Sequence, residues 1–189
     1  MKKILKRKDY DRIEEELNIL IEDYGVKYFP MDCFEVASLM NIEIKSYSQF
    51  SQEDCDFIVS HSEDGFTIFK NKKYVIYYNE KKNDERIRFT IWHEIAHIHL
   101  GHLEKDCKIS YEQMEEEANH FATHALAPLQ FVHRLSLFSP LMLCTVCGVS
   151  FELANYVLAH YRNAFQYESI KKAILSNRIS KLLTFEGGE

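Results

Sequence analysis

Two histidines four residues apart, in the segment His93-Glu94-Ile95-Ala96-His97, are the feature that most constrains this chain. Four residues make about one turn of helix, so both imidazole rings project from one helix face and could bind one metal ion. Glu94 is rotated by about 100° from His93, which places its carboxylate beside a water at the metal without making it a ligand. The segment therefore predicts a helix that carries a zinc site, with Glu94 as general base.

A catalytic site with three protein ligands needs one more side chain from elsewhere in the chain. In the metzincin pattern a glycine and a third histidine follow at fixed distances. Gly101 and His102 stand four and five residues after His97, which does not match that pattern. We expect Gly101 to end the helix, and His99 and His102 to lie at the surface or behind the ligands.

Three consecutive glutamates, Glu115, Glu116 and Glu117, offer a carboxylate instead. Glu115 shares a helix face with Asn119 and Ala122, whereas Glu116 and Glu117 point away from that face. We therefore predict Glu115 as the third metal ligand, with Asn119 hydrogen-bonded to the far nitrogen of a ligand histidine. Glu116 and Glu117 are expected on a solvated acidic face.

Composition and charge exclude several classes of protein. The formal net charge of -6 argues against an electrostatic nucleic-acid binder, although Gly148–Ser150 before a helix resembles a helix-turn-helix turn. No apolar run approaches the roughly 20 residues of a membrane span, and no secretory signal follows the basic residues 1–8. Five scattered cysteines, including Cys144 and Cys147, form no disulfide framework and suit a reducing cytoplasm.

Periodicity and turn residues predict an α+β fold with a small antiparallel sheet beside a larger helical part. Asp64-Gly65 is expected to form a hairpin turn, Asn71-Lys72 another turn, and strand 73–79 to pair with an extended substrate. Asp32, Ser110 and Ser150 are expected to cap helices. The expected strands are 42–47, 56–60, 66–70 and 73–79; the expected helices are 9–24, one from Asp32, 84–101, one from Ser110 to 126, 129–137, 151–164 and 167–183.

Taken together, several segments resemble the ImmA/IrrE metallopeptidases. The segments are Arg88–His97, Leu100–His102, Glu115–Ala122 and Leu126–Pro128, and the resemblance covers about residues 25–160. It implies a zincin-like, gluzincin-type core with His93, His97 and Glu115 as zinc ligands and Glu94 as the catalytic acidic residue. Trp92, Ala96 and Ala127 depart from the usual family residues, which concerns substrate fit rather than metal binding.

The resemblance also implies a partner. Many members are encoded beside a helix-turn-helix repressor, and the better-known ones cleave or inactivate it in a stress or mobile-element switch. We therefore expect a cytoplasmic endopeptidase that acts on such a repressor and contacts neither membrane nor nucleic acid directly. The alternative is a non-proteolytic, zinc-containing binding partner or antitoxin-like regulator. The domain plan that we expect is a metallopeptidase domain over residues 1–135 and a C-terminal helical extension over 136–189, within the same domain.

Overall fold

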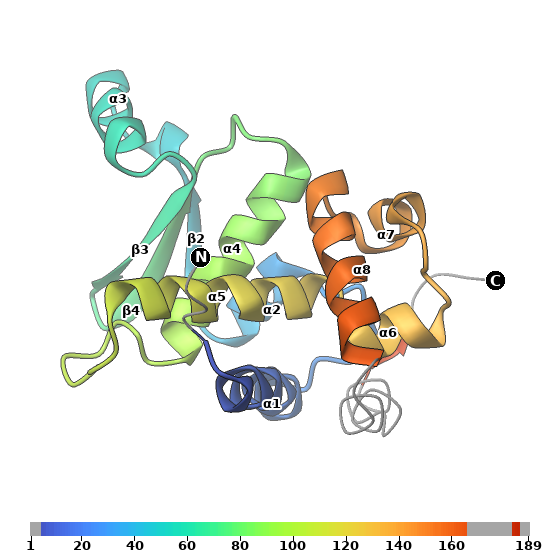
Figure 1. Cartoon of the computed structure of the whole chain (residues 1–189). Coiled ribbons are helices and arrows are strands. Elements are labelled where there is room, and N and C mark those ends of the chain that lie inside the picture. The colour runs from blue at the N-terminus through green and yellow to red at the C-terminus, as the bar shows by residue number, and fades with distance from the viewer. Residues whose placement is uncertain (1–4, 166–182, 186–189) are drawn as a thin grey trace. The chain divides into compact units, whose positions relative to one another are not determined.

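The structure, a computed structural model, describes residues 5–165 and 183–185 (Figure 1). The chain divides into two compact units, each built from two separate stretches of sequence. Unit 1 contains the described residues up to Glu16 together with Asp32–Ala122, and unit 2 contains Leu17–Met31 and the described residues from Thr123 onward. Boundaries between the units fall within α1 (Arg7–Tyr24) and α5 (Tyr111–Leu126), so each unit combines two stretches of the chain. The expected domain plan, with one boundary after residue 135, is a different kind of division and stays a prediction.

Unit 1 combines a small sheet with helices, which confirms the predicted α+β class. Its elements in chain order are the first part of α1 (Arg7–Tyr24), α2 (Cys33–Leu39), β2 (Glu43–Ser46), the 3₁₀ turn η1 (Tyr47–Gln49), α3 (Gln52–His61), β3 (Gly65–Lys70), β4 (Lys73–Tyr78), α4 (Asp84–His99) and most of α5 (Tyr111–Leu126).

The three strands lie in the order β2-β4-β3, and the sheet is mixed. β3 pairs antiparallel with β4, but β2 pairs parallel with β4, so the expectation of a purely antiparallel sheet is wrong. Parallel neighbours need a crossover connection rather than a tight turn. Here α3 and β3 supply that crossover between β2 and β4.

The predicted turn at Asn71-Lys72 is confirmed as the hairpin connection. It joins the paired residues Lys70 and Lys73, and both turn residues have positive φ, 53° at Asn71 and 63° at Lys72. This is the geometry of a two-residue type I′ turn, whose twist matches that of the flanking strands.

The predicted strand 56–60 and the predicted hairpin turn at Asp64-Gly65 are both wrong. Residues 56–60 lie within α3, which begins at a cap where the Ser51 hydroxyl accepts a hydrogen bond from the Asp54 backbone N–H at 3.2 Å. Acidic residues in the first turn of α3 also interact favourably with the helix dipole. These signals at the start of the segment favour a helix, whereas the apolar run Phe57–Val59 by itself suggested a strand.

Helices cover both faces of the sheet. α2 and α4 contact one face, and the other face packs against η1 and α3 (Figure 1). Strand residues alternate between the faces because successive side chains point in opposite directions. On β3 this sends Phe66 and Ile68 to the cluster on the α3 side, and Thr67 toward Glu94 of α4.

The two site-bearing helices have well-defined ends. α4 begins at Asn83, whose side chain accepts from the Arg86 N–H at 2.9 Å, and α5 follows Ser110, whose hydroxyl accepts from the Gln113 N–H at 3.2 Å. Gly101 ends α4 with a φ of 71°, the left-handed conformation that favours glycine. The ends predicted from sequence for these helices are therefore confirmed to within two residues.

Unit 2 contains the end of α1 and four further elements that precede the last described strand. These are β1 (Tyr28–Phe29), α6 (Leu129–Arg134), α7 (Pro140–Cys147) and α8 (Phe151–Phe165), followed by β5 (Thr184–Phe185), which pairs parallel with β1. Phe29 stacks on Phe131 at a ring-centroid distance of 4.3 Å within a core that also includes Leu143 and Val157.

α7 is a helix that the sequence analysis missed. The Ser139 hydroxyl caps it and Pro140 occupies its first turn, a position that tolerates proline because that N–H has no helical partner. Cys144 and Cys147 are not joined in a disulfide, and they are half-buried and buried respectively, as expected for ordinary cysteines. The expected helix 167–183 lies outside the described residues.

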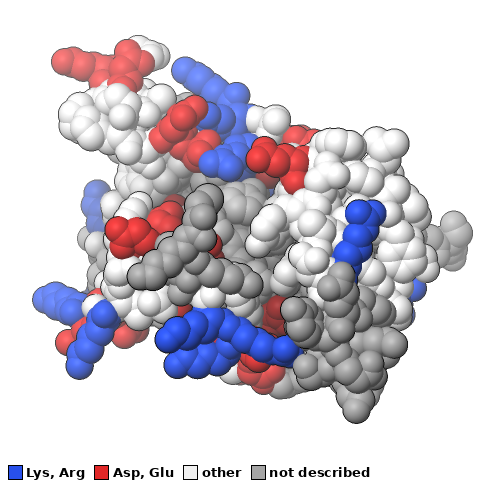
Figure 2. Space-filling view, viewed as in Figure 1, with Lys and Arg blue, Asp and Glu red and all other residues white. Residues whose placement is uncertain are grey.

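α7 and α8 meet at an angle of 114° around Gly148, which has a φ of 60°. This resembles helix-turn-helix geometry, but α8 contains a single Lys or Arg, Arg162, and its face in Figure 2 is mostly uncharged. Within the described ranges no single helix is long and apolar enough to cross a membrane; α7 and α8 meet that test only as a bent pair.

The hairpin turn predicts a stabilising substitution. Lys72→Gly should raise the free energy of unfolding by about 0.5–1 kcal/mol, because a left-handed conformation strains lysine but not glycine. Urea unfolding of the two proteins measures the difference. The control is Lys73→Gly in the neighbouring strand, which should lower stability by a similar amount. Destabilisation by both substitutions would contradict the turn geometry.

Candidate metal centre

α4 and α5 bring His93, His97 and Glu115 together, with one ligand atom from each lying within 4.8 Å of the others. The two histidine Nε2 atoms are 3.0 Å apart, and each lies 3.4 Å from a Glu115 carboxylate oxygen. An ion held tetrahedrally about 2.0–2.1 Å from its ligands separates them by about 3.3 Å. The three side chains therefore fit around one metal ion.

The far nitrogen of His93 is held by Asn119, one helical turn after Glu115 on α5. His93 Nδ1 lies 3.1 Å from the Asn119 amide oxygen. An amide oxygen can only accept, so His93 carries its proton on Nδ1 and leaves the Nε2 lone pair free for a metal. The structure thus brings Asn119 to the histidine pair as the sequence predicted.

The far nitrogen of His97 meets a residue that the sequence left unplaced. His97 Nδ1 lies 3.1 Å from His102 Nδ1, and His102 Nε2 lies 3.3 Å from Glu117 Oε2. His102 is buried behind the ligands, so the alternative of a surface position is wrong. His99, by contrast, turns to α1 and contacts the backbone oxygen of Glu16 at 3.0 Å.

Glu117 is 1% exposed, so the predicted solvated position is wrong for this residue, whereas Glu116 is exposed as expected. Arg12 of α1 donates to its carboxylate, as does Gln113 at 2.9 Å. Burial by itself raises the pKa of Glu117, but these hydrogen bonds outweigh it and hold the pKa below its ordinary range. Helical phase could not reveal this burial because the partner comes from the distant α1.

Glu94 lies beside the ligands without joining them. Its carboxylate accepts a hydrogen bond from the Thr67 hydroxyl of β3 at 2.7 Å, and the residue is 9% exposed. Burial raises the pKa of the Glu94 carboxyl above its ordinary value, although the Thr67 hydrogen bond and His93 oppose this. A carboxylate with a raised pKa is a stronger base, which suits proton transfer near neutral pH. Nothing in the sequence around Thr67 indicated this contact.

His97 and Glu115 have the ionisation states that metal binding requires. Burial lowers the pKa of His97 to about 4, so its imidazole is neutral at pH 7. The neighbouring His93 imidazole, 3.4 Å away, lowers the pKa of Glu115, which is therefore a carboxylate. Neutral imidazoles and carboxylates are the forms that coordinate metals.

The metal-ligand group opens into a cavity of about 760 Å³. Apolar and aromatic side chains line it around the polar group, and two of them, Leu103 and Tyr111, are 44% and 71% exposed. The cavity also reaches the first residues of β3, an edge strand of the sheet. The strand expected to meet a substrate, 73–79, corresponds to β4, which is central and paired on both sides; that expectation is wrong.

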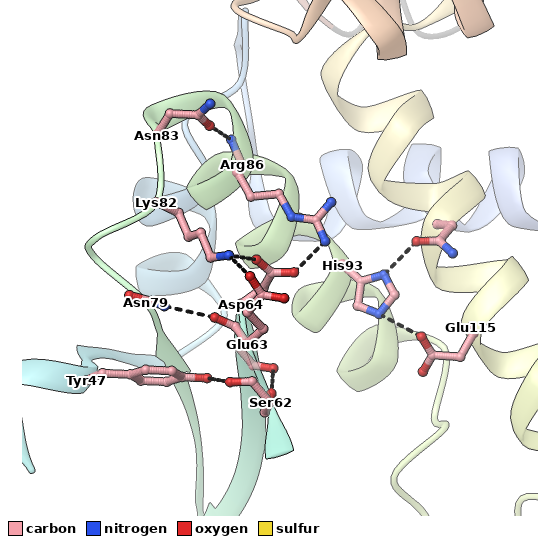
Figure 3. Close-up of polar contacts among 12 residues, drawn as sticks. Tyr47, Ser62, Glu63, Asp64, Asn79, Lys82, Asn83, Arg86, His93 and Glu115 are labelled. Atoms are coloured by element: carbon pink, nitrogen blue, oxygen red, sulfur yellow. Dashed lines mark hydrogen bonds and ion pairs between the residues drawn. The ribbon is translucent and has the colours of Figure 1, made fainter. Parts of the chain in front are cut away.

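Charged and polar contacts fix the start of β3 at the rim of this cavity (Figure 3). Asp64 pairs with Arg86 and with Lys82, which lies 3.4 Å away, and Lys82 also pairs with Glu63. The Asn79 side chain donates to the Glu63 backbone oxygen at 2.9 Å. The hydrogen bond from Arg86 lowers the pKa of Asp64, so the ion pairs of Asp64 persist well below neutral pH.

Gly65 serves close approach rather than a turn. A Cβ atom at this position would lie 2.5 Å from the Thr90 methyl of α4 and 2.9 Å from the Tyr77 backbone oxygen. Real Cβ atoms do not approach neighbours so closely, so a side chain would push β3 away from α4. The absence of a side chain at Gly65 therefore helps to keep Thr67 within reach of Glu94.

Comparison with protein families finds a match that covers the candidate site. A family model described as the IrrE N-terminal-like domain, of a peptidase family, matches residues 46–159, more than half of the chain. No curated protein sequence matches the chain. The matched residues include the whole metal-ligand group, Glu94 and Thr67.

Metal retention tests the choice of carboxylate. We expect about one divalent ion per chain by elemental analysis after dialysis, and Glu115→Ala should lose most of it because one of three ligands is removed. The matched control is Glu116→Ala, which removes an exposed glutamate from the same helix and should retain the ion. Equal metal content in the two variants would assign the third ligand elsewhere.

Proposed function

The chain belongs to the peptidase family of the IrrE N-terminal-like domain, as its resemblance to the ImmA/IrrE metallopeptidases predicted, and we propose that it is a zinc-dependent endopeptidase. The observation that carries the proposal is the position of Glu94, a buried carboxylate beside three ligand side chains at the wall of an open cavity. A structural metal site is fully ligated and needs no adjacent base. Two histidines and one glutamate are a ligand set found in catalytic zinc sites.

Each side chain has a separate task in the proposed hydrolysis. His93, His97 and Glu115 would hold the ion, which when bound supplies a Lewis acid that polarises the scissile carbonyl and acidifies a water. Glu94 accepts the proton of the attacking water and returns it to the leaving nitrogen. Thr67 holds one Glu94 oxygen by its hydrogen bond, which leaves the other oxygen for the proton.

We further propose that the substrate binds in an extended conformation along β3. Among the described residues β3 has a strand neighbour only on its β4 side, so no strand pairs with its other edge. An extended peptide can add to such an edge by main-chain hydrogen bonds. Thr67 lies on this strand, so a peptide bound there would run past Glu94.

The proposed substrate is one specific protein, a helix-turn-helix repressor, so that the peptidase would take part in transcription regulation. Support comes from the resemblance to ImmA/IrrE proteins, many of which are encoded beside such a repressor. Unrestricted cleavage would endanger a cytoplasmic host, and the short β3 edge offers few positions for reading a peptide. Selectivity would then depend on docking outside the cleft.

Substitution of the proposed base separates chemistry from binding. Glu94→Gln should leave metal content and melting temperature close to those of the parent chain, because an amide keeps the shape of the carboxyl group. Hydrolysis should fall by about 10²–10⁴-fold, because the amide cannot accept a proton at neutral pH. Glu116→Gln serves as the control with full activity. Substantial cleavage by the Glu94 variant would remove it from this role.

Substrate choice is tested by parallel digestion. The zinc-loaded chain is incubated under identical conditions with denatured casein and with a helix-turn-helix repressor encoded next to it. We expect defined cleavage of the repressor and little cutting of casein. Fast, dispersed cutting of casein without preference for the repressor would instead identify a general peptidase. A complex with the repressor that contains no cleaved product would favour the non-proteolytic binding partner.

A further inference from the structure

The turn that ends α4 folds His102 back over the metal ligand His97. The His102 N–H donates to the His97 carbonyl at 3.0 Å, and the Gly101 N–H donates to the Ile98 carbonyl at 3.2 Å. Together with the left-handed Gly101, these two bonds form a Schellman motif. The motif brings the two imidazoles edge to face, with ring centroids 5.0 Å apart and the two Nδ1 atoms 3.1 Å apart.

Metal binding through His97 Nε2 then fixes the protons along a chain of three side chains. With Nε2 unprotonated, the neutral His97 ring carries its proton on Nδ1 and donates it to His102 Nδ1. His102 must therefore carry its own proton on Nε2, where it faces Glu117 Oε2 at 3.3 Å. Glu117 completes the chain as an acceptor, and because Arg12 and Gln113 donate to its two oxygens as well, it does so as an ionised carboxylate.

An ionised carboxylate at this depth needs compensation. Glu117 is 1% exposed, and a buried charge without partners is strongly destabilising. Arg12 supplies the opposite charge from α1, and Gln113 donates to the second carboxylate oxygen at 2.9 Å. The Arg12 side chain is itself 43% exposed, so it bridges from solvent to the buried carboxylate.

We propose that His102, Glu117 and Arg12 are positioning residues that fix the tautomer and ring orientation of His97. On this assignment α1, which precedes the matched residues 46–159, contributes Arg12 to the side chains that support the metal centre. The two ligand histidines are held differently: His93 by the single residue Asn119, His97 by a chain that ends on another helix. The inference rests on the metal site of the proposed function but not on its substrate.

Metal affinity is the primary measurement. Zinc affinity is determined by competition with a chromophoric chelator at fixed pH for Arg12→Gln, Glu117→Gln and His102→Leu. Each should bind zinc about 10–100-fold more weakly than the parent chain, the usual effect of removing a hydrogen-bond partner of a ligand histidine. Matched controls are Arg7→Gln, on the same helix as Arg12, and Glu116→Gln, next to Glu117; both should stay within about twofold.

Three further measurements separate positioning from a merely structural role. The cobalt(II)-substituted variants should show altered ligand-field absorption bands, which report the geometry at the metal. His102→Gln, which can accept and donate as the imidazole does, should recover part of the affinity that His102→Leu loses. The double variant Arg12→Gln/His102→Leu should lose no more affinity than His102→Leu alone, because the two act through one chain, whereas Asn119→Ala should add its own loss.

Two sets of results would overturn the proposed positioning role. Unchanged zinc affinity and unchanged cobalt spectra in all three single variants would overturn the proposal, even if urea unfolding shows that the metal-free proteins are less stable. Independent, additive losses for Arg12 and His102 would also overturn it. Arg12→Gln alters a half-exposed side chain and keeps the test available if a buried variant fails to fold. Because no peptide is used, a parent chain that binds zinc but cleaves nothing would refute the proposed function alone.

Discussion

The register between α4 and α5 is the constraint on which the proposed metal centre depends, because two candidate ligands come from one helix and the third from the other. Several contacts within unit 1 hold this register. The buried Trp92 ring meets Phe121 at a centroid distance of 6.5 Å, and His93 meets Asn119 at 3.1 Å. A shift of one residue along α5 would turn Glu115 by about 100° and separate it from the histidine pair.

Behind the ligands the chain buries polar groups that a simple apolar core would exclude. His102 and Glu117 both lie in the interior, where an unpaired carboxylate would be costly. Their hydrogen bonds compensate that cost only if each partner is present, so the cluster tolerates few alternative arrangements. Because these hydrogen bonds are buried, they hold the His97 imidazole in one orientation. The same interior position keeps His97 neutral, as metal binding requires.

The cleft depends on a different kind of constraint, which is the close approach of the edge strand to α4. Gly65 permits that approach, and the rim ion pairs around Asp64 hold the strand start in place. The result is that Thr67 reaches Glu94 while the outer edge of β3 remains unpaired among the described residues. Glu94, the proposed general base, and the start of this strand thereby line one cavity.

The sequence by itself determined the features that follow from local spacing. Helical periodicity placed His93 and His97 on one face and Glu115 with Asn119 on another, and hydroxyl caps marked where α5 begins. Such features depend on residues within about one helical turn of each other, which a single sequence displays. The positive-φ turn at Asn71-Lys72 belongs to the same local class.

Only the tertiary structure decided the features that depend on distant partners. The parallel pairing of β2 and the burial of Glu117 could not be read from local pattern. Glu117 illustrates the reason: its helical phase indicates a direction but not what lies there, and what lies there is Arg12, 105 residues earlier in the chain. Packing between segments far apart in sequence determines whether a charged side chain meets water or a buried partner.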